Sequence, residues 1–251
     1  MPRTAEIIAV GSELLTGGVT NTNARFLSEL LTAAGVDVLY HTAVGDDEGR
    51  LEAAVTAARQ RAELLVCTGG LGPTYDDMTK TAVCAALDTP LVFHSDIVPD
   101  IRRYFDTVFH REMPACNLRQ AYLPQGCTVF RNPVGTAPGC AFTAGGVTAV
   151  LLPGVPSECR YLAEHCLLPY LERLHGQVIR SHDLRIFGLT EPQVQELLND
   201  LLHQEKDLTL APYAGTGEVS LHLSARAADD AACERSEERR VGKECRSRGA
   251  P

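Results

Sequence analysis

The chain has 251 residues, of which 45% are hydrophobic and 22% charged, and its formal net charge is −9 at pH 7. This composition is ordinary for a globular protein, and the length suits one large or two modest domains. The acidic balance disfavours a nucleic-acid surface, and no apolar run reaches the roughly 18 residues that span a bilayer. Residues 1–11 also lack a signal-peptide pattern. We therefore expect a cytoplasmic protein that binds no membrane and has no general nucleic-acid surface.

The first third of the chain alternates between strand and helix patterns. Apolar strand patterns lie at 5–11, 36–44 and 63–68, and helical patterns follow at about 21–34, 45–62 and 79–87. Repetition of this order favours a mainly parallel sheet with right-handed crossovers and helices on its faces. The predicted fold class is therefore α/β.

Polar residues follow each of these strands, where open α/β sheets bind their ligands. They are Glu13, Thr22, Asn23, Asp46, Asp47, Asp76 and Asp77. Asn and Asp at such positions are also common helix caps. Both interpretations stay open for each aspartate, and most of all for Asp47.

The stretch TGGLGPTYDDMT, at residues 68–79, joins the third strand to its helix. Gly69, Gly70 and Gly72 allow close approach to the backbone, and the amides up to Thr74 could cradle a pyrophosphate at the helix start. The carboxylates that follow the turn would repel an anion unless a divalent cation lay between them. The pattern thus predicts a metal-bridged phosphate, although glycine turns with capping aspartates also occur for structural reasons alone.

The patterns change after residue 87. An amphipathic helix is expected around 97–108, and a short polar helix at 114–121 that carries Asn117, Arg119 and Gln120 outward. Two antiparallel strands are expected at 139–143 and 147–152. Pro153 and Gly154 then form a corner whose amides could face a ligand, before a helix that ends near residue 174.

A second domain is predicted from residue 175. Strand patterns at 178–187, 208–212 and 218–225 surround a helical pattern at 190–202, which indicates a small α+β domain over 175–234 after a first domain over 1–174. Residues 235–251 begin RSEERRVGKEC, which is the translation of a common sequencing-library adapter. We interpret them as an assembly artefact, the alternative being a basic tail that binds a partner.

Six separated strings resemble the CinA family (competence/damage-inducible protein A), whose first domain is shared with the molybdopterin-binding proteins MogA and MoaB. In the family's order they are IIAVGSELLTGGVTNTNARFL, TAVGDDEGRL, VCTGGLGPTYDDMTKTAV, NLRQAYLPQG, NPVGTAPG and LLPGVPSE. They span residues 7–158, and residues 178–225 look like the family's KH-like middle domain. The resemblance implies a MogA/MoaB-like α/β domain, a KH-like domain and a homo-oligomer, with the family's C-terminal amidohydrolase domain absent.

The resemblance also implies a metal-dependent pyrophosphohydrolase that cleaves ADP-ribose, or a related dinucleotide, to AMP and a sugar phosphate. The molybdopterin branch instead transfers an adenylyl group to a bound pterin, and this alternative without hydrolysis stays open. The family's metal–nucleotide centre matches Asp46 and Asp77 as catalytic residues. Mg²⁺ or a similar divalent cation is expected on Asp46, Asp76 and Asp77, with Glu13 nearby. Asn21 departs from the pattern, because CinA proteins often have Asp there.

A third hypothesis makes the KH-like segment a nucleic-acid or partner-binding module. The residues before the basic tail carry a net charge of −12, which argues against it. The segment also lacks a clear G-x-x-G clamp, because Gly215 and Gly217 are only two positions apart.

Overall fold

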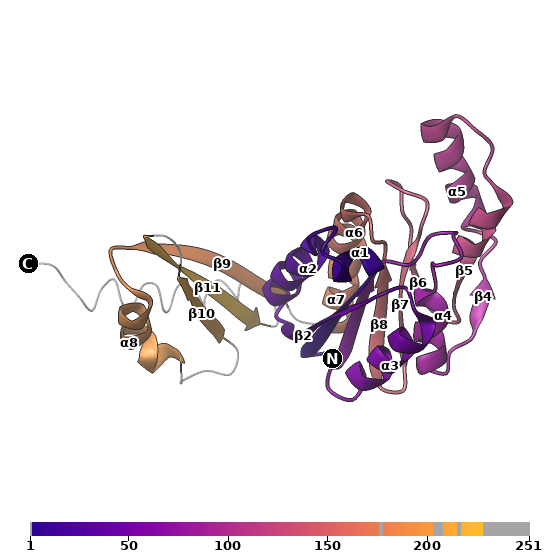
Figure 1. The fold of residues 1–251 in the computed structure, drawn as a ribbon. Coiled ribbons are helices and arrows are strands. Elements are labelled where there is room, and N and C mark those ends of the chain that lie inside the picture. Colours follow the sequence, from indigo (N-terminus) through magenta and orange to yellow (C-terminus); the bar gives the residue numbers. More distant parts are fainter. Residues whose placement is uncertain (1, 176–177, 203–207, 215–216, 228–251) are drawn as a thin grey trace, which may run out of the picture. The chain divides into compact units, whose positions relative to one another are not determined.

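The computed structural model describes residues 2–175, 178–202, 208–214 and 217–227 (Figure 1). Contacts divide the chain into two units. The first comprises the residues up to Leu31 together with Val36–Tyr170, and the second comprises Thr32–Gly35 and the residues from Leu171 onward. The region interpreted as an adapter-derived tail lies outside the described residues.

A six-stranded sheet forms the centre of the first unit, in the order β2-β1-β3-β8-β7-β6. Its strands are β1 (Thr4–Val10), β2 (Asp37–Val44), β3 (Leu64–Thr68), β6 (Thr128–Phe130), β7 (Gly139–Ala144) and β8 (Val147–Leu152). β2, β1, β3 and β8 are parallel, while β7 runs antiparallel to both of its neighbours. The mainly parallel α/β sheet is confirmed, and so is the antiparallel pair, which turns at Gly145 and Gly146.

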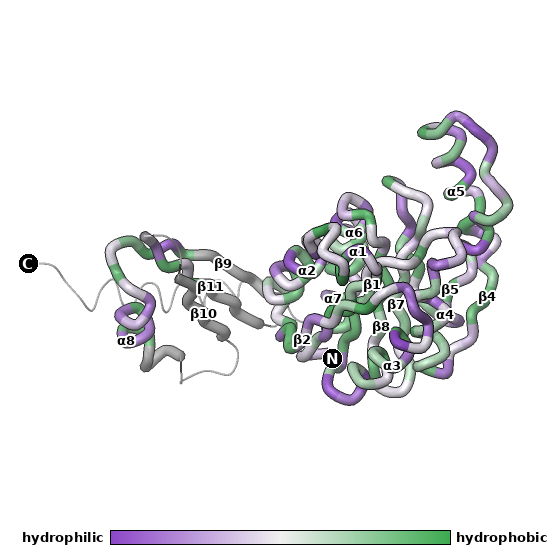
Figure 2. The backbone as a smooth tube through the Cα atoms, in the orientation of Figure 1, coloured by the Kyte–Doolittle hydropathy of each residue, from purple (hydrophilic) through white to green (hydrophobic). Residues whose placement is uncertain are grey.

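The central strands form because their residues are apolar on both faces, as parallel strands covered by helices require. All five residues of β3 and all six of β8 are buried. Leu51 and Val55 of α3 (Glu48–Ala58) and Val83 of α4 (Thr79–Ala86) belong to one core cluster with alternate strand residues. Figure 1 shows α2 (Thr22–Ala33) and α6 (Pro156–Leu162) on the other side of the sheet, and Figure 2 shows hydrophobic residues concentrated along the central strands.

The insertion between α4 and β6 departs from the expected arrangement of polar side chains. It contains β4 (Leu91–Phe93) paired with β5 (Tyr122–Pro124), then α5 (Val98–Tyr104), the π-helical turn η1 (Phe105–Phe109) and the 3₁₀ helix η2 (Ala115–Ala121). The predicted outward position of Asn117 and Gln120 is wrong, because both are buried, whereas Arg119 is exposed. In a 3₁₀ helix residues three apart are aligned, so Asn117 donates to Gln120 Oε1 at 2.9 Å, and Gln120 donates to Thr136 at 3.1 Å.

Within the second unit the described residues form the predicted α+β arrangement. β9 (Val178–Phe187), β10 (Leu208–Ala214) and β11 (Glu218–Ala227) make an antiparallel sheet in the order β10-β11-β9. α8 (Glu191–Leu202) begins after Thr190, whose amide and hydroxyl both donate to Gln193 Oε1, at 2.8 and 2.9 Å. The bond from the Thr190 amide to the Gln193 side chain is one half of a capping box, a common helix start.

α7 (Leu168–His175) follows the π-helical turn η3 (Ala163–Leu167), which continues α6. The helix predicted to end near residue 174 therefore ends at His175. α1 (Ser12–Leu15) is a single turn directly after β1. It belongs to the edge of the sheet where the predicted site residues lie.

Candidate functional site

The carboxyl ends of four parallel strands lie side by side. Val10 of β1 pairs with Val44 of β2, Ala9 with Thr68 of β3, and Thr68 with Leu152 of β8. The residues that follow these ends are Glu13 after β1, Asp46 after β2, the glycine turn after β3, and Pro153 and Gly154 after β8. Positions far apart in sequence are thus brought to one edge of the sheet.

The glycine turn is held against β1 and α4 so closely that side chains are excluded. Gly69 has φ 102°, and a Cβ atom there would lie 2.1 Å from the carbonyl oxygen of Val10. Gly70 has φ 62°, and its Cβ atom would lie 2.3 Å from Thr79 Oγ1, which itself donates to the Gly69 carbonyl at 2.8 Å. Positive φ and these contacts explain why glycine is needed at both positions.

Asp77 organises the second half of the same turn. Its Oδ1 accepts from the Gly72 amide at 2.8 Å, and its Oδ2 accepts from the Thr74 amide at 2.8 Å and from the Thr74 hydroxyl. The amides of Gly72 and Thr74, which were expected to cradle a phosphate, therefore already hold a carboxylate of the chain. Asp76, next to it, is exposed.

Asp46 and Asp47 differ in what they bind. Asp47 is the N-cap of α3 and accepts from the Arg50 amide at 2.8 Å. Asp46 Oδ2 accepts from the Ser12 amide at 2.8 Å, and the Asp46 amide donates to Ser12 Oγ at 3.1 Å. This pair joins the ends of β1 and β2 and leaves Asp46 Oδ1 without a hydrogen-bond partner among the described residues.

A cavity of about 310 Å³, here called the site cavity, opens beside the glycine turn. It brings together four predicted residues, Glu13, Thr22, Asn23 and Gly154, with Thr68. Asn23 is a brace at its base, because its Nδ2 donates to Thr68 Oγ1 at 3.1 Å and to the Gly154 carbonyl at 2.8 Å.

Two further contacts shape the site cavity. Thr68 Oγ1 donates to the Pro153 carbonyl at 2.9 Å. Asn21, the residue that departs from the family pattern, also lines the cavity and caps α2 by accepting from the Ala24 amide at 3.0 Å. The helix start and the strand ends are therefore linked through side chains.

The carboxylates at the strand ends do not enclose a metal by themselves. Within the described part of the chain, no group of three or more His, Cys, Asp or Glu side chains is close enough to hold a metal. β1 separates β2 from β3, so the backbones at Asp46 and Gly69 are about 10 Å apart. Mg²⁺, however, often takes one or two carboxylates and completes its shell with water and substrate phosphate. The residues fit a cation shared with a phosphate and not one caged by protein alone.

Sequence reasoning missed a basic pair beside the turn. Arg119 Nη1 donates to the Thr74 carbonyl at 3.3 Å, and Lys80 Nζ donates to the Arg119 carbonyl at 2.8 Å. Burial lowers the pKa of the Lys80 ammonium to about 8. The neighbouring sequence does not predict this burial, because Lys80 lies at the start of a helix, where a lysine is usually solvated.

Glu158 was also missed, although it ends the quoted string LLPGVPSE. Asn132 Nδ2 donates to its Oε2 at 2.6 Å, and burial raises the pKa of its carboxyl. A Cβ atom at Gly135 would lie 2.0 Å from Glu158 Cδ, so glycine makes room for the carboxylate. The string itself is the signal, because Glu158 follows Pro153, Gly154 and Pro156 within it.

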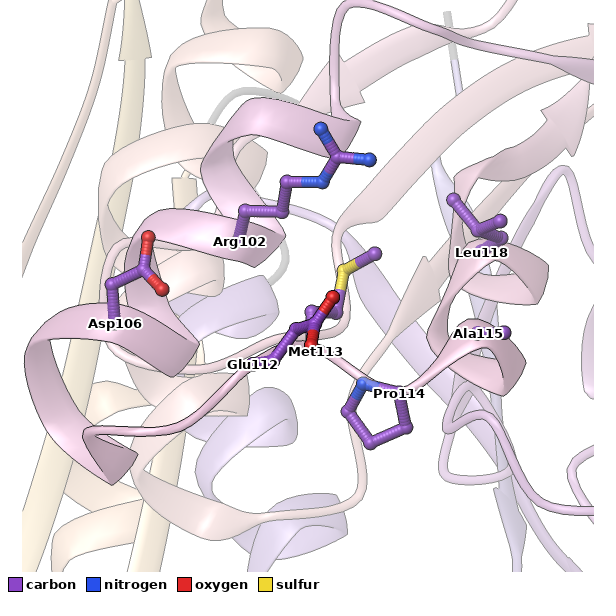
Figure 3. A pocket seen from close by; sticks show the side chains of 7 residues that line it. All are labelled: Arg102, Asp106, Glu112, Met113, Pro114, Ala115 and Leu118. Atoms are coloured by element: carbon purple, nitrogen blue, oxygen red, sulfur yellow. The ribbon is translucent and has the colours of Figure 1, made fainter.

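A second cavity, of about 740 Å³, lies in the insertion and is lined by none of the predicted site residues (Figure 3). Figure 3 shows Arg102 and Asp106 on one side, Ala115 and Leu118 on the other, and Glu112, Met113 and Pro114 between them. It is therefore separate from the candidate site.

Two family models match the chain. The model described as "Probable molybdopterin binding domain" matches residues 6–173, and the model described as "Damage-inducible protein CinA KH domain" matches residues 181–246. The chain belongs to the CinA family. The family and the MogA/MoaB-like fold expected from the six strings are confirmed. The second match runs into the suspected tail, outside the described residues, and the domain boundaries stay a prediction.

Individual CinA relatives agree with this assignment. Proteins named competence-damage inducible protein are 44% identical over 223 residues in Acetivibrio thermocellus and 46% identical over 224 residues in a Geobacillus species. These matches cover 89% and 88% of this chain and 54% of each relative, so the chain spans about half the length of the curated relatives it matches.

A solved structure supports the same fold. The CinA protein of Thermoplasma acidophilum, described as of unknown function, superposes with a TM-score of 0.60 at 35% identity, covering 64% of this chain and 94% of that one. As for membranes, none of the helices in the described ranges has the length and apolar character needed to cross one.

Proposed function

We propose that this CinA-family chain hydrolyses the pyrophosphate bond of ADP-ribose or a related dinucleotide. The oxygen of a water molecule bonds to one phosphorus atom and the bridging P–O bond breaks. The products are AMP and a sugar phosphate, and the protons of the water pass to the leaving phosphate and to solvent. The alignment of the ends of β1, β2, β3 and β8 carries the proposal, because it unites Glu13, Asp46, the glycine turn and Gly154 where α/β sheets bind ligands.

The glycine turn and the site cavity meet at Thr68, which lines the cavity and directly precedes Gly69. In the proposed complex the pyrophosphate lies at the turn and a sugar or base occupies the cavity. The volume of about 310 Å³ is at the lower end of small-molecule sites. Glu13 and Thr22 have side-chain oxygens without hydrogen-bond partners in the described ranges, and ribose hydroxyls are suitable partners for them.

A divalent cation such as Mg²⁺ belongs to the proposal. One or two of the carboxylates of Asp46, Asp76 and Asp77 would hold it, and water and substrate phosphate would complete its shell. Asp77 Oδ1 accepts only the hydrogen bond from Gly72 in the described residues. The cation would offset negative charge on the phosphate oxygens. The chain's own residues orient the substrate, through the turn that Asp77 organises and the brace that Asn23 provides.

Chromatography after incubation of the full chain with ADP-ribose and Mg²⁺ tests the proposal. We expect AMP from the parent and loss of turnover in Asp46→Asn. Asp47→Asn is the matched control, because Asn caps a helix about as well as Asp, and it should keep turnover. Absence of AMP from a folded parent with several divalent metals would refute hydrolysis, and full turnover by Asp46→Asn would remove Asp46 from the chemistry.

The second candidate is a pterin-binding domain that transfers an adenylyl group and does not hydrolyse dinucleotides. It is favoured by the match of residues 6–173 to the molybdopterin-binding family model. Titration with molybdopterin, and a search for its adenylylated form after addition of ATP, would support this candidate over the first. A homo-oligomer remains part of either proposal, and light scattering would test it.

A further inference from the structure

The two halves of the basic pair connect the glycine turn to η2. Arg119 reaches the turn through its guanidinium, which donates to the Thr74 carbonyl at 3.3 Å. Its backbone is held from the other direction, since Lys80 Nζ donates to the Arg119 carbonyl at 2.8 Å. Lys80 lies three positions after Asp77. Arg119 is therefore bonded to Thr74 within the turn and to Lys80 directly after it.

Two of the turn amides that a phosphate would be expected to use already have a partner. Gly72 and Thr74 donate their amide hydrogens to Asp77, at 2.8 Å each. The Asp77 carboxylate thus occupies the position at these amides where an anion would bind. A phosphate placed there would therefore be bound more tightly with donors from another element.

Arg119 has such donors. A guanidinium carries five N–H groups in a planar fork that matches two phosphate oxygens, and in the described ranges only the bond to Thr74 uses one of them. The side chain is exposed, although its neighbours Asn117 and Gln120 on η2 are buried. In a 3₁₀ helix residues three apart lie on the same face. Asn117 and Gln120 therefore share the buried face that anchors η2, and Arg119 lies on a different, exposed face.

Lys80 gives this arrangement its rigidity. Only 7% of Lys80 is exposed, and a buried ammonium is costly unless it is partnered. Its hydrogen-bond partner is a main-chain carbonyl of η2, and the Asp77 carboxylate of the turn is a nearby opposite charge. The ammonium therefore holds η2 in place beside the turn.

We propose that Arg119 binds the substrate phosphate opposite the glycine turn and that Lys80 is the positioning residue that holds Arg119 there. This assignment rests on the proposed function for its substrate. It also explains why the turn can hold its own carboxylate and still serve an anionic ligand. The ligand class is a pyrophosphate, free or within a dinucleotide.

Kinetics and binding on the full chain test the assignment. Arg119→Ala should raise the KM for ADP-ribose and the Kd for inorganic pyrophosphate by roughly 10- to 100-fold, the usual effect of losing a charged hydrogen-bond donor, with a smaller change in kcat. Arg119→Lys should give KM and Kd values between those of the parent and of Arg119→Ala, because lysine keeps the charge but loses the planar fork of N–H donors. Arg102→Ala is the matched control, an exposed arginine in the second cavity, and should change neither constant.

The role of Lys80 is tested by a double-mutant cycle. Lys80→Met should raise KM in the parent but have no further effect in Arg119→Ala, because it acts through Arg119; additive losses would overturn the positioning role. If Lys80→Met does not fold, the Arg119 variants decide the assignment alone.

Failure of this inference can be told apart from failure of the proposed hydrolysis. Pyrophosphate binding that depends on Arg119, in a parent that makes no AMP, would retain the assignment and refute hydrolysis. Unchanged KM and pyrophosphate affinity in Arg119→Ala, with an active parent, would overturn the assignment alone. A folded parent that neither binds pyrophosphate nor makes AMP would overturn both.

Discussion

Asp77 Oδ1 accepts a hydrogen bond from the Gly72 amide at 2.8 Å, and a Cβ atom at Gly72 would lie 2.4 Å from Asp77 Oδ2. The aspartate and the glycine therefore depend on each other. The glycine leaves the space that the carboxylate fills, and the carboxylate satisfies the amides that the turn exposes. Predictions about this turn must treat the two residues as a unit.

Gly72→Ala should lower the free energy of unfolding by about 1–3 kcal/mol, because the added methyl group overpacks the turn. Urea unfolding would measure the loss. Gly49→Ala, in α3, is the control, since its nearest neighbour to an added Cβ is 3.7 Å away and alanine favours helices. Equal stability of Gly72→Ala and the parent would show that the carboxylate can move aside without cost.

Asp77→Asn should lower the unfolding free energy by about 1–3 kcal/mol, because an amide group would meet the donors of Gly72 and Thr74 with one acceptor in place of two. Thermal unfolding would measure the loss. Asp76→Asn is the control, and its stability should be close to that of the parent because Asp76 is exposed. If both variants unfold like the parent, the hydrogen bonds to Asp77 contribute little to stability.

Asn23→Asp should also destabilise the chain, by about 2 kcal/mol, because it replaces a donor with a carboxylate facing the Gly154 carbonyl. Asn21→Asp is an informative partner variant. Its side chain only accepts, from the Ala24 amide at 3.0 Å, and Asp caps as well as Asn. Denaturant unfolding should show a loss of stability in Asn23→Asp and little change in Asn21→Asp. Similar losses in both variants would contradict the different roles of the two side chains.

Glu158→Gln should stabilise the chain at neutral pH. Burial raises the pKa of the Glu158 carboxyl above the ordinary value of 4.5. The stability contributed by its proton is therefore complete below pH 4.5 and is lost as the pH rises through the raised pKa. Glutamine stays neutral and can still accept from Asn132. The stability difference should be small in acid and grow towards neutrality, and a difference independent of pH would refute the linkage.

The strand ends could be predicted from sequence because their signals are local. Residues 64–67 are an uninterrupted apolar run shortly before the glycines, and β9 begins and ends at the predicted residues. Glu13, Asp46 and the turn came together because parallel strands end at one edge. Lys80 could not be placed in this way, since its burial depends on η2, which lies 39 positions away at Arg119. The burial of Gln120 likewise depends on Thr136, which accepts its hydrogen bond from outside η2, and Asn117 in turn bonds to Gln120.

The antiparallel β7 has a further consequence for access to the site. Because β6 and β8 both run opposite to β7, the loop between β6 and β7 returns to the same edge as the glycine turn, while Gly145 and Gly146 turn at the far edge. Both of these glycines are exposed, and nothing lies within 4 Å of a Cβ atom added there, but their φ angles of 58° and 82° strain any other residue. A peptide tether inserted between the two glycines would keep both of them and would be attached at the opposite end of the strands from the ligand site, which suits immobilised binding measurements.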